Sequence, residues 1–407
     1  MLTTIRPPSP IKKLFCNGRL WWRFYEKYQA RLRPAIVENI ISLLSCGLLI
    51  RGYALYHCSH SACLHTKKIA FSCKSRFCPT CGKKATDQWI ATQQAVLPHT
   101  EWQHLTFTIP SQLWILFQYN RALLTQLSPL AAKTVQTVAR QKNCLPGIFT
   151  ALHTFGRDLK WNPHVHLSVT CGGLTDDHQV WKPLYFARHL IMPRWRYEII
   201  TLLRQTYARG ELVLPPRLQA ACPTLADWNR WLDHHYRKAW IVHFAKPHHN
   251  PQRNINYLGR YLKRPPLALS RLKHYDGNTV VFAYLNHTTQ RHQTATYDAE
   301  AFIKRFVQHI PDKGFRMIRY YGFLAHRVRS TLLPKVYQLL EQPEKPIIPI
   351  RYPTLLQQRF GLDPLQCILC QSPLRLAGVV IGLSSHQLQP YHQHLAWMKP
   401  IPFGSLA

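Results

Sequence analysis

The 407-residue sequence predicts an α+β fold with a small cysteine-rich domain in its N-terminal part. Two apolar runs, GIFTALHTFGRDL at 147–159 and HVHLSVTCGG at 164–173, are typical of a strand pair around a turn at Lys160–Pro163. Longer stretches with helical periodicity lie before and after this pair. A cysteine-dense block runs from Cys58 to Cys81, upstream of both strands.

The remaining elements follow from periodicity and from turn residues. Mixed apolar and polar faces predict helices over about 18–50, 112–140 and 193–243. Alternation predicts strands in HLTFTIP at 104–110 and in TVVFAYLNH at 279–287. The stretch DAEAFIKRFVQHI at 298–310 predicts a helix with Asp298 as its N-cap.

Changes in composition along the chain predict three parts. Residues 1–100 form a helical part that contains the cysteine block, and residues 101–341 form a second part that contains the predicted strand pair. Residues 342–407 begin with EQPEKPIIPIRYP, a proline-rich linker, and end in a short tail that contains Cys367 and Cys370.

The charge of the chain indicates a polyanionic partner. Lys and Arg total 52 against 18 Asp and Glu, which gives a formal net charge of +34 spread along the whole sequence. Nucleic acid is the usual partner for such a surplus, and an anionic membrane surface is the alternative. The apolar stretch at 36–50 is too short to span a bilayer, and the N-terminus has no apolar signal core. We therefore expect a soluble intracellular protein, in which twelve cysteines favour metal binding or free thiols over disulfides.

The cysteine block predicts one structural zinc site. Cys78-x-x-Cys81 followed by a glycine has the form of a zinc knuckle, and Cys58 with Cys63 supplies a second pair of thiolates. Cys73 and the histidines at 57, 60 and 65 are alternative ligands. Basic residues of the same block, including Lys74 and Arg76, favour a DNA-binding role for the zinc module. Cys367-x-x-Cys370 is either half of a zinc site or a pair of plain thiols, and we favour the thiols slightly.

The stretch WNPHVHLSV at 161–169 contains a histidine pair. His164 and His166 occupy alternate positions of a predicted strand, so both imidazoles lie on one face, about 6–7 Å apart. Two imidazoles so placed can bind one divalent metal ion. The plainer interpretation is an outer strand face that happens to hold two histidines.

The stretch NINYLGRYLKRPP at 254–266 contains a tyrosine pair. Tyr257 and Tyr261 are four residues apart and share one face of a predicted helix, among Arg260, Lys263 and Arg264. A tyrosine hydroxyl beside a metal ion and a basic surface can attack a phosphodiester. The alternative is a pair of aromatic side chains that only pack.

Taken in order, the cysteine block, NPHVHLSV, YLGRYLKRPP and FIKRFVQHIPDKGFRMIRYYG at 302–322 resemble the insertion sequence 91 family of bacterial rolling-circle transposases. This family lies within the HUH (His-hydrophobe-His) nuclease superfamily. The resemblance implies an antiparallel sheet flanked by helices, with His164 and His166 binding Mg²⁺ or Mn²⁺. It also implies that Tyr257 and Tyr261 are the nucleophiles, which form 5′-phosphotyrosine bonds with single-stranded transposon ends.

The same resemblance leaves the third metal ligand open. Asp158 lies across the hairpin from His164 if the turn spans 159–163, and His153 is the other candidate. It implies that residues 1–100 form a zinc-binding and DNA-binding domain and that residues 101–341 form the two-tyrosine catalytic domain. It also implies action on DNA in the bacterial cytoplasm, on the nucleoid. A replication initiator or relaxase with the same chemistry, or a non-catalytic zinc-containing nucleic-acid binder, is the alternative function.

Overall fold

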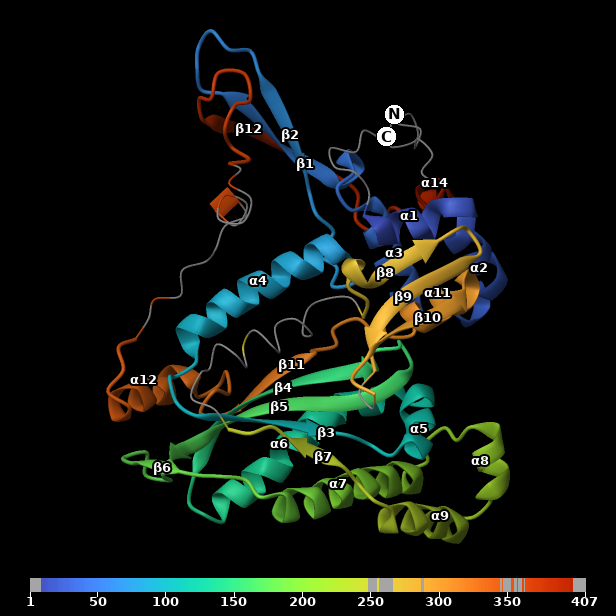
Figure 1. Ribbon diagram of the computed structural model, residues 1–407, viewed down its shortest axis with the longest axis vertical. Helices are drawn as coiled ribbons and strands as arrows, with labels where there is room; N and C mark the ends of the chain where they lie inside the picture. Colours follow the sequence, from blue (N-terminus) through green and yellow to red (C-terminus); the bar gives the residue numbers. More distant parts are fainter. Residues whose placement is uncertain are drawn as a thin grey trace.

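The computed structural model describes residues 9–247, 255, 266–286, 289–344, 346, 353–354, 357, 361 and 363–397. Within these residues the strands form a six-stranded antiparallel sheet and two three-stranded antiparallel sheets (Figure 1). The predicted α+β fold is confirmed.

The six-stranded sheet is the centre of the molecule. Its strand order is β11-β4-β5-β3-β7, and β6 pairs with the far end of β5. The strands are β3 (Trp102–Phe107), β4 (Leu145–Phe155), β5 (Trp161–Leu174), β6 (Trp181–Pro183), β7 (Val242–Phe244) and β11 (Ile318–Gly322). The predicted strands at 104–110, 147–159 and 164–173 are thus β3, β4 and β5, and the hairpin turn lies at 156–160, earlier than predicted.

Strand β5 has two different faces because successive side chains point in opposite directions. Val165, Leu167 and Val169 are fully buried in the largest hydrophobic cluster. His164 and His166 lie on the opposite face.

Five helices contribute side chains to the hydrophobic cluster on the face of Val165. They are α5 (Trp114–Tyr119), α6 (Leu124–Arg140), α7 (Arg188–Ala208), α8 (Pro216–Ala221) and α9 (Leu225–Arg237). Both α6 and α7 lie along the sheet (Figure 1), and α6 packs directly against β4 and β5. Helical structure predicted over 112–140 and 193–243 is confirmed in most of its length, with a non-helical connection before α8 and β7 at the end.

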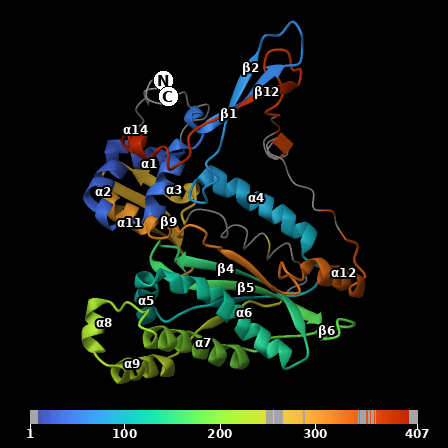
Figure 2. The ribbon, with the colours of Figure 1, turned by 180° about the vertical axis from the view of Figure 1, so that it is seen from behind.

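Two helices cover part of the other face, near β11. They are α4 (Pro79–Val96) and α12 (Arg329–Leu339), which pack with Phe149 and Ala151 of the sheet (Figure 2). Trp89 of α4 makes an edge contact with Phe149 and donates a hydrogen bond of 2.9 Å to the Tyr320 hydroxyl. No described helix is long and apolar enough to cross a membrane.

A second body forms around the N-terminal helices. It combines α1 (Pro10–Cys16), α2 (Leu20–Tyr28) and α3 (Pro34–Ser45) with β8 (Leu272–Tyr275), β9 (Thr279–Leu285), β10 (His292–Asp298), α11 (Ala299–Val307) and α14 (His392–Ala396). Asp298 caps α11 by accepting a hydrogen bond from the Ala301 amide, as predicted. One core therefore contains residues from all three parts of the chain that the composition distinguishes.

A three-stranded arm projects from this second body (Figure 1). It is built from β1 (Gly52–Cys58), β2 (Thr66–Ala70) and β12 (Leu374–Ile381), in the order β12-β1-β2. The segment after residue 342, predicted as a linker and a short tail, thus contributes an edge strand and the helix α14.

Candidate functional site

Three histidines meet on the face of the central hairpin opposite Val165. The ligand nitrogens of His153, His164 and His166 all lie within 4.8 Å of one another. His153 of β4 is the direct antiparallel partner of His164, and Ala151 is the partner of His166. His164 and His166 therefore lie on the same face of β5, as predicted. The hairpin adds a third imidazole, that of His153.

Neighbouring groups fix two of these rings through their Nδ1 atoms. His164 Nδ1 lies 2.8 Å from the carbonyl oxygen of Asn162, to which it donates a hydrogen bond. His166 Nδ1 lies 3.1 Å from Nε2 of His104 and 3.3 Å from the Thr106 hydroxyl. In each ring this leaves Nε2 for a metal ion, the arrangement in which an outer partner orients a ligand histidine.

Burial keeps these imidazoles neutral. Desolvation lowers the pKa of His164 to about 4, and it holds the pKa of His166 well below its usual value, with the neighbouring histidines adding to the effect. Because a neutral imidazole is the form that binds metal, the cluster is ready to bind a cation at neutral pH.

Asp158 is not part of this cluster. Its carboxylate accepts a hydrogen bond of 3.2 Å from the Lys160 amide and pairs with the Lys160 ammonium at 2.9 Å. The turn begins earlier than predicted, so Asp158 caps the loop and does not lie opposite His164. The alternative candidate, His153, is the residue that the hairpin brings to the pair.

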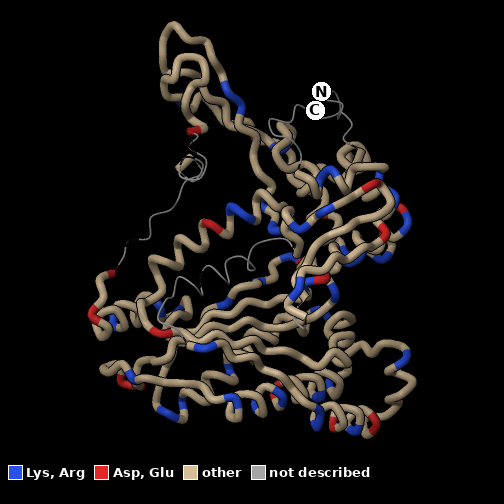
Figure 3. Tube along the Cα trace, in the orientation of Figure 1, with Lys and Arg blue, Asp and Glu red and all other residues tan. Residues whose placement is uncertain are grey.

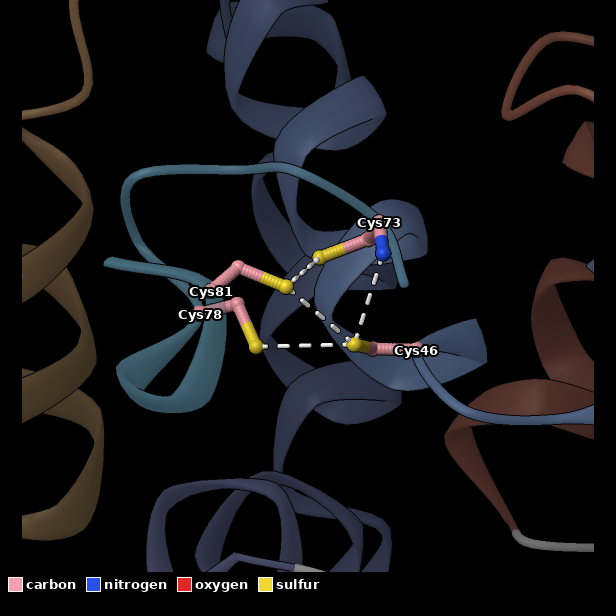
Figure 4. A group of neighbouring side chains, drawn as sticks. All are labelled: Cys46, Cys73, Cys78 and Cys81. Carbon is pink, nitrogen blue, oxygen red and sulfur yellow. Dashed lines mark hydrogen bonds between the residues drawn. The ribbon is translucent and has the colours of Figure 1, made fainter. Parts of the chain in front are cut away.

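Four cysteines gather where α4 begins (Figure 4). Cys46 follows α3, Cys73 follows β2, and Cys78 and Cys81 lie at the start of α4. The sulfur of Cys46 is 3.6 Å from those of Cys78 and Cys81, and Cys73 is also 3.6 Å from Cys81. A tetrahedral zinc ion with bonds of about 2.3 Å to sulfur separates its ligands by about 3.8 Å, so this cluster has the dimensions of a four-thiolate site.

The other two predicted zinc ligands lie elsewhere. Cys58 and Cys63 are at the tip of the arm, together with Cys367 and Cys370. The predicted grouping of Cys58 and Cys63 with Cys78 and Cys81 is therefore replaced by two separate clusters. Cys367 and Cys370, for which plain thiols were slightly favoured, belong to the second cluster.

The predicted DNA-contacting residues divide into two groups. Lys74 is exposed beside the first cysteine cluster, and Arg76 is half-buried there, where desolvation lowers its pKa to about 10. Tyr257, Tyr261, Arg260, Lys263 and Arg264 lie outside the described residues. Lys and Arg occur on every part of the described chain, whereas Asp and Glu are few (Figure 3).

Comparison with known proteins assigns the family. Residues 19–109 match the transposase zinc-binding domain, and residues 147–331 match a putative transposase family (Y2_Tnp). The chain is 42% identical over 398 residues to the transposase for insertion sequence element IS801 of Pseudomonas savastanoi pv. phaseolicola, covering 96% of this chain and 95% of that protein. This chain is a transposase of the IS91/IS801 family. The family resemblance predicted from the motifs is confirmed.

A second relative agrees with this assignment. The putative transposase y4qJ of Sinorhizobium fredii (strain NBRC 101917 / NGR234) is 31% identical over 365 residues, covering 86% of the transposase described here and 91% of its relative. A solved N-terminal nuclease domain of the minute virus of mice non-structural protein 1 also matches, over 75% of this chain and all of that one. Its TM-score of 0.20 and identity of 11% are too low to support a conclusion.

The sequence analysis did not identify two candidate functional residues of the transposase, His104 and Cys46. His104 lies in the predicted strand HLTFTIP, but only the pairing of β3 with β5 brings it to His166. Cys46 ends a helical run and has no nearby cysteine to indicate a zinc pair. A strand histidine on the same face as a His-x-His pair is the signal that would have identified His104.

Proposed function

We propose that this transposase nicks and rejoins single-stranded DNA through 5′-phosphotyrosine intermediates, in rolling-circle transposition on the bacterial nucleoid in the cytoplasm. The observation that carries the proposal is the cluster of His153, His164 and His166 on the central antiparallel hairpin of a transposase. The proposal extends the activity from DNA transposition in general to an HUH-type cleavage reaction.

The donor set of the cluster fits a divalent transition metal. Three imidazole nitrogens suit Mn²⁺ better than Mg²⁺, which prefers oxygen ligands and keeps several waters. Of the two predicted ions we therefore favour Mn²⁺, with His153 in place of Asp158 as the third ligand. A bound metal ion would polarise the scissile phosphate and so make phosphorus more electrophilic.

Tyr257 and Tyr261 are the proposed nucleophiles. The attacking tyrosine oxygen forms a bond to phosphorus, the bond to the 3′-oxygen breaks, and the leaving oxygen takes up a proton as the tyrosine loses one. The phosphotyrosine keeps the energy of the phosphodiester, so the reverse attack by a 3′-hydroxyl rejoins the strand without ATP. A second tyrosine allows another strand to be cut while the first is still attached.

One described residue connects the tyrosine motif to the histidine face. Ile255 is 1% exposed and lies in the hydrophobic cluster that contains Phe149 and Ala151. Ala151 pairs directly with His166 across the hairpin. Tyr257 follows Ile255 by two residues in the sequence. The burial of Ile255 in this cluster supports the assignment of the tyrosine motif to the same site.

Basic residues of the transposase would hold the DNA. We assign backbone contacts to Lys74 and Arg76 near the first cysteine cluster, and to Arg260, Lys263 and Arg264 beside the tyrosines. The net charge of +34 supplies general affinity for phosphates, which carries little sequence information.

The first cysteine cluster is the proposed zinc site of the N-terminal domain. Cys46, Cys73, Cys78 and Cys81 lie within the matched zinc-binding domain. The Cys73 amide donates to the Cys46 sulfur at 3.5 Å, and the Ser75 amide donates to the Cys73 sulfur at 3.4 Å. Such hydrogen bonds from backbone amides stabilise thiolates. Because Cys46 follows α3 and Cys78 and Cys81 lie at the start of α4, a bound zinc ion would hold the start of α4 against α3.

The test is a search for a protein–DNA adduct that survives denaturation, with Mn²⁺ and single-stranded transposon ends. The wild-type protein should form the adduct, each single Tyr→Phe variant should retain some, and Tyr257→Phe/Tyr261→Phe should form none. Tyr275→Phe is the matched control, because Tyr275 lies on β8 in the second body and should leave adduct formation unchanged. An adduct in the double variant would refute the assignment, and no adduct in the wild type would favour a non-catalytic binder.

A further inference from the structure

The arm has no hydrophobic core of its own. None of the hydrophobic clusters of the described chain includes a residue between 51 and 72 or between 363 and 382. Leu376, Val379 and Ile381 of β12 are 58%, 57% and 89% exposed. A three-stranded sheet with so little buried apolar surface needs another source of stability.

Four cysteine sulfurs at the tip of the arm provide a candidate source. The sulfur of Cys58 is 3.3 Å from that of Cys370, and the sulfur of Cys63 is 3.8 Å from that of Cys367. All four sulfurs lie within 4.8 Å of one another. These separations bracket the spacing of about 3.8 Å that four thiolates adopt around zinc.

The backbone around the four sulfurs is arranged to stabilise thiolates. The His60 amide donates to the Cys58 sulfur at 3.4 Å. This donor lies two residues after its cysteine, which is the spacing found in a zinc knuckle.

A fifth residue orients the cluster from outside. His65 Nδ1 lies 3.2 Å from the Cys367 sulfur. His65 is not among the four groups that converge, so its contact is that of a hydrogen-bond donor to a thiolate ligand.

We infer that Cys58, Cys63, Cys367 and Cys370 bind a second structural zinc ion, which joins an N-terminal and a C-terminal segment of the chain at the tip of the arm. The match to the zinc-binding domain ends at residue 109 and the second family match ends at residue 331, so Cys367 and Cys370 lie outside both. The site takes Cys58 from the end of β1, Cys63 from the β1–β2 connection, and the other two thiolates from the turn before β12. It is independent of the proposed cleavage chemistry.

Counting zinc ions tests the inference. Native mass spectrometry of the full-length, reduced protein should show two zinc ions per chain. Cys367→Ser/Cys370→Ser should show one, because the first cluster remains intact, and Cys73→Ser/Cys78→Ser should also show one. Cys144→Ser is the matched control and should retain two, since Cys144 is a buried cysteine outside both clusters.

Two results would overturn the inference. One is a single zinc ion in the wild-type protein. This includes a protein whose mass is lower by two hydrogens, because a disulfide then takes the place of the second zinc ion. The other is two zinc ions in Cys367→Ser/Cys370→Ser.

Limited proteolysis distinguishes loss of the second zinc ion from general unfolding. In Cys367→Ser/Cys370→Ser, new cleavage should fall in 52–72 and 363–382 while the fragment with the central sheet stays intact. Cleavage throughout the sheet would instead show that the arm has no separate zinc-dependent stability. Failure of the adduct test leaves the zinc count unaffected, so each result can be assigned to its own proposal.

Discussion

His166 connects the inner and outer parts of the candidate metal site. Its imidazole is 9% exposed and lies beside His153 and His164 on one side and His104 on the other. His104 in turn contacts the Ser168 hydroxyl at 3.1 Å. This chain of contacts leaves the ring little freedom, so we regard His104 as a positioning residue for the metal ligand.

Replacement of the third ligand tests the composition of the site. His153→Ala should lower the rate of DNA cleavage by about 100-fold or more, because metal assistance contributes several kcal/mol to such a reaction. Asp158→Ala removes a carboxylate of the same hairpin that pairs with Lys160, so cleavage should stay within a few-fold of wild type. Single-turnover cleavage at saturating Mn²⁺ measures both variants. If Asp158→Ala lost more cleavage activity than His153→Ala, Asp158 would be the third metal ligand instead of His153.

The histidine pair was predictable from the sequence, but the third ligand was not. Alternation along one strand determines that His164 and His166 share a face, and this needs no knowledge of a partner strand. The choice between Asp158 and His153 depends on the register of the hairpin, which a shift of a few residues in the turn decides. The same limit applies to His104, which comes from a third strand.

At the scale of the elements, the last residue of β11 must be a glycine. Gly322 has a φ of +63°, and a Cβ atom there would lie 1.6 Å from the carbonyl oxygen of Pro146. Glycine therefore permits both the left-handed backbone and the close approach of β11 to β4. This approach places Tyr320 and Tyr321 next to the strand that contains His153.

Gly322→Ala should destabilise the protein by about 3 kcal/mol or more, because backbone strain and a steric clash act together. Gly314→Ala is the control, since Gly314 has a φ of +78° with nothing within 4 Å of its Cβ position. It should cost only the conformational strain of about 1–2 kcal/mol. Urea unfolding measures both variants, and equal losses would show that the contact with Pro146 relaxes without cost.

Elements with strong local patterns were predictable, and elements that depend on distant partners were not. An amphipathic repeat and a capping aspartate predict the helix at 298–310 from its own residues. Strand β12, LRLAGVVI, has a proline-rich stretch before it and exposed apolar side chains, so its partner β1 cannot be inferred from its own residues. The grouping of the cysteines failed for the same reason, because β12 pairs with β1 across some 300 residues of sequence.

At the scale of the whole molecule, α14 holds the C-terminal segment on the N-terminal helices. Trp21 of α2 donates a hydrogen bond to Nε2 of His392, and three aromatic rings surround this imidazole. Burial lowers the pKa of His392 from 6.5 to about 4. The contact thus depends on a neutral histidine.

The stability of the transposase should therefore fall on acidification. Between pH 6.5 and about 4 an unfolded chain binds a proton at His392 that the folded chain does not, so the free energy of unfolding decreases as pH falls through this range. His392→Gln keeps an acceptor for Trp21 and removes the titration. The difference between urea midpoints at pH 7 and pH 5 should be smaller in this variant than in wild type. His292→Gln, at an exposed position of β10, should leave the wild-type difference unchanged.

The pairing of β1 with β12 also determines when the arm can fold during protein synthesis. Cys63 and Cys367 contact each other across 304 residues of sequence. At a synthesis rate of about 5–20 residues per second, the first pair of thiols waits about 15–60 s for the second to leave the ribosome. During that interval the β1–β2 hairpin has neither its third strand nor half of its proposed zinc ligands. A chain that stops before residue 367 can never complete the arm, so the arm distinguishes finished transposase molecules from truncated ones.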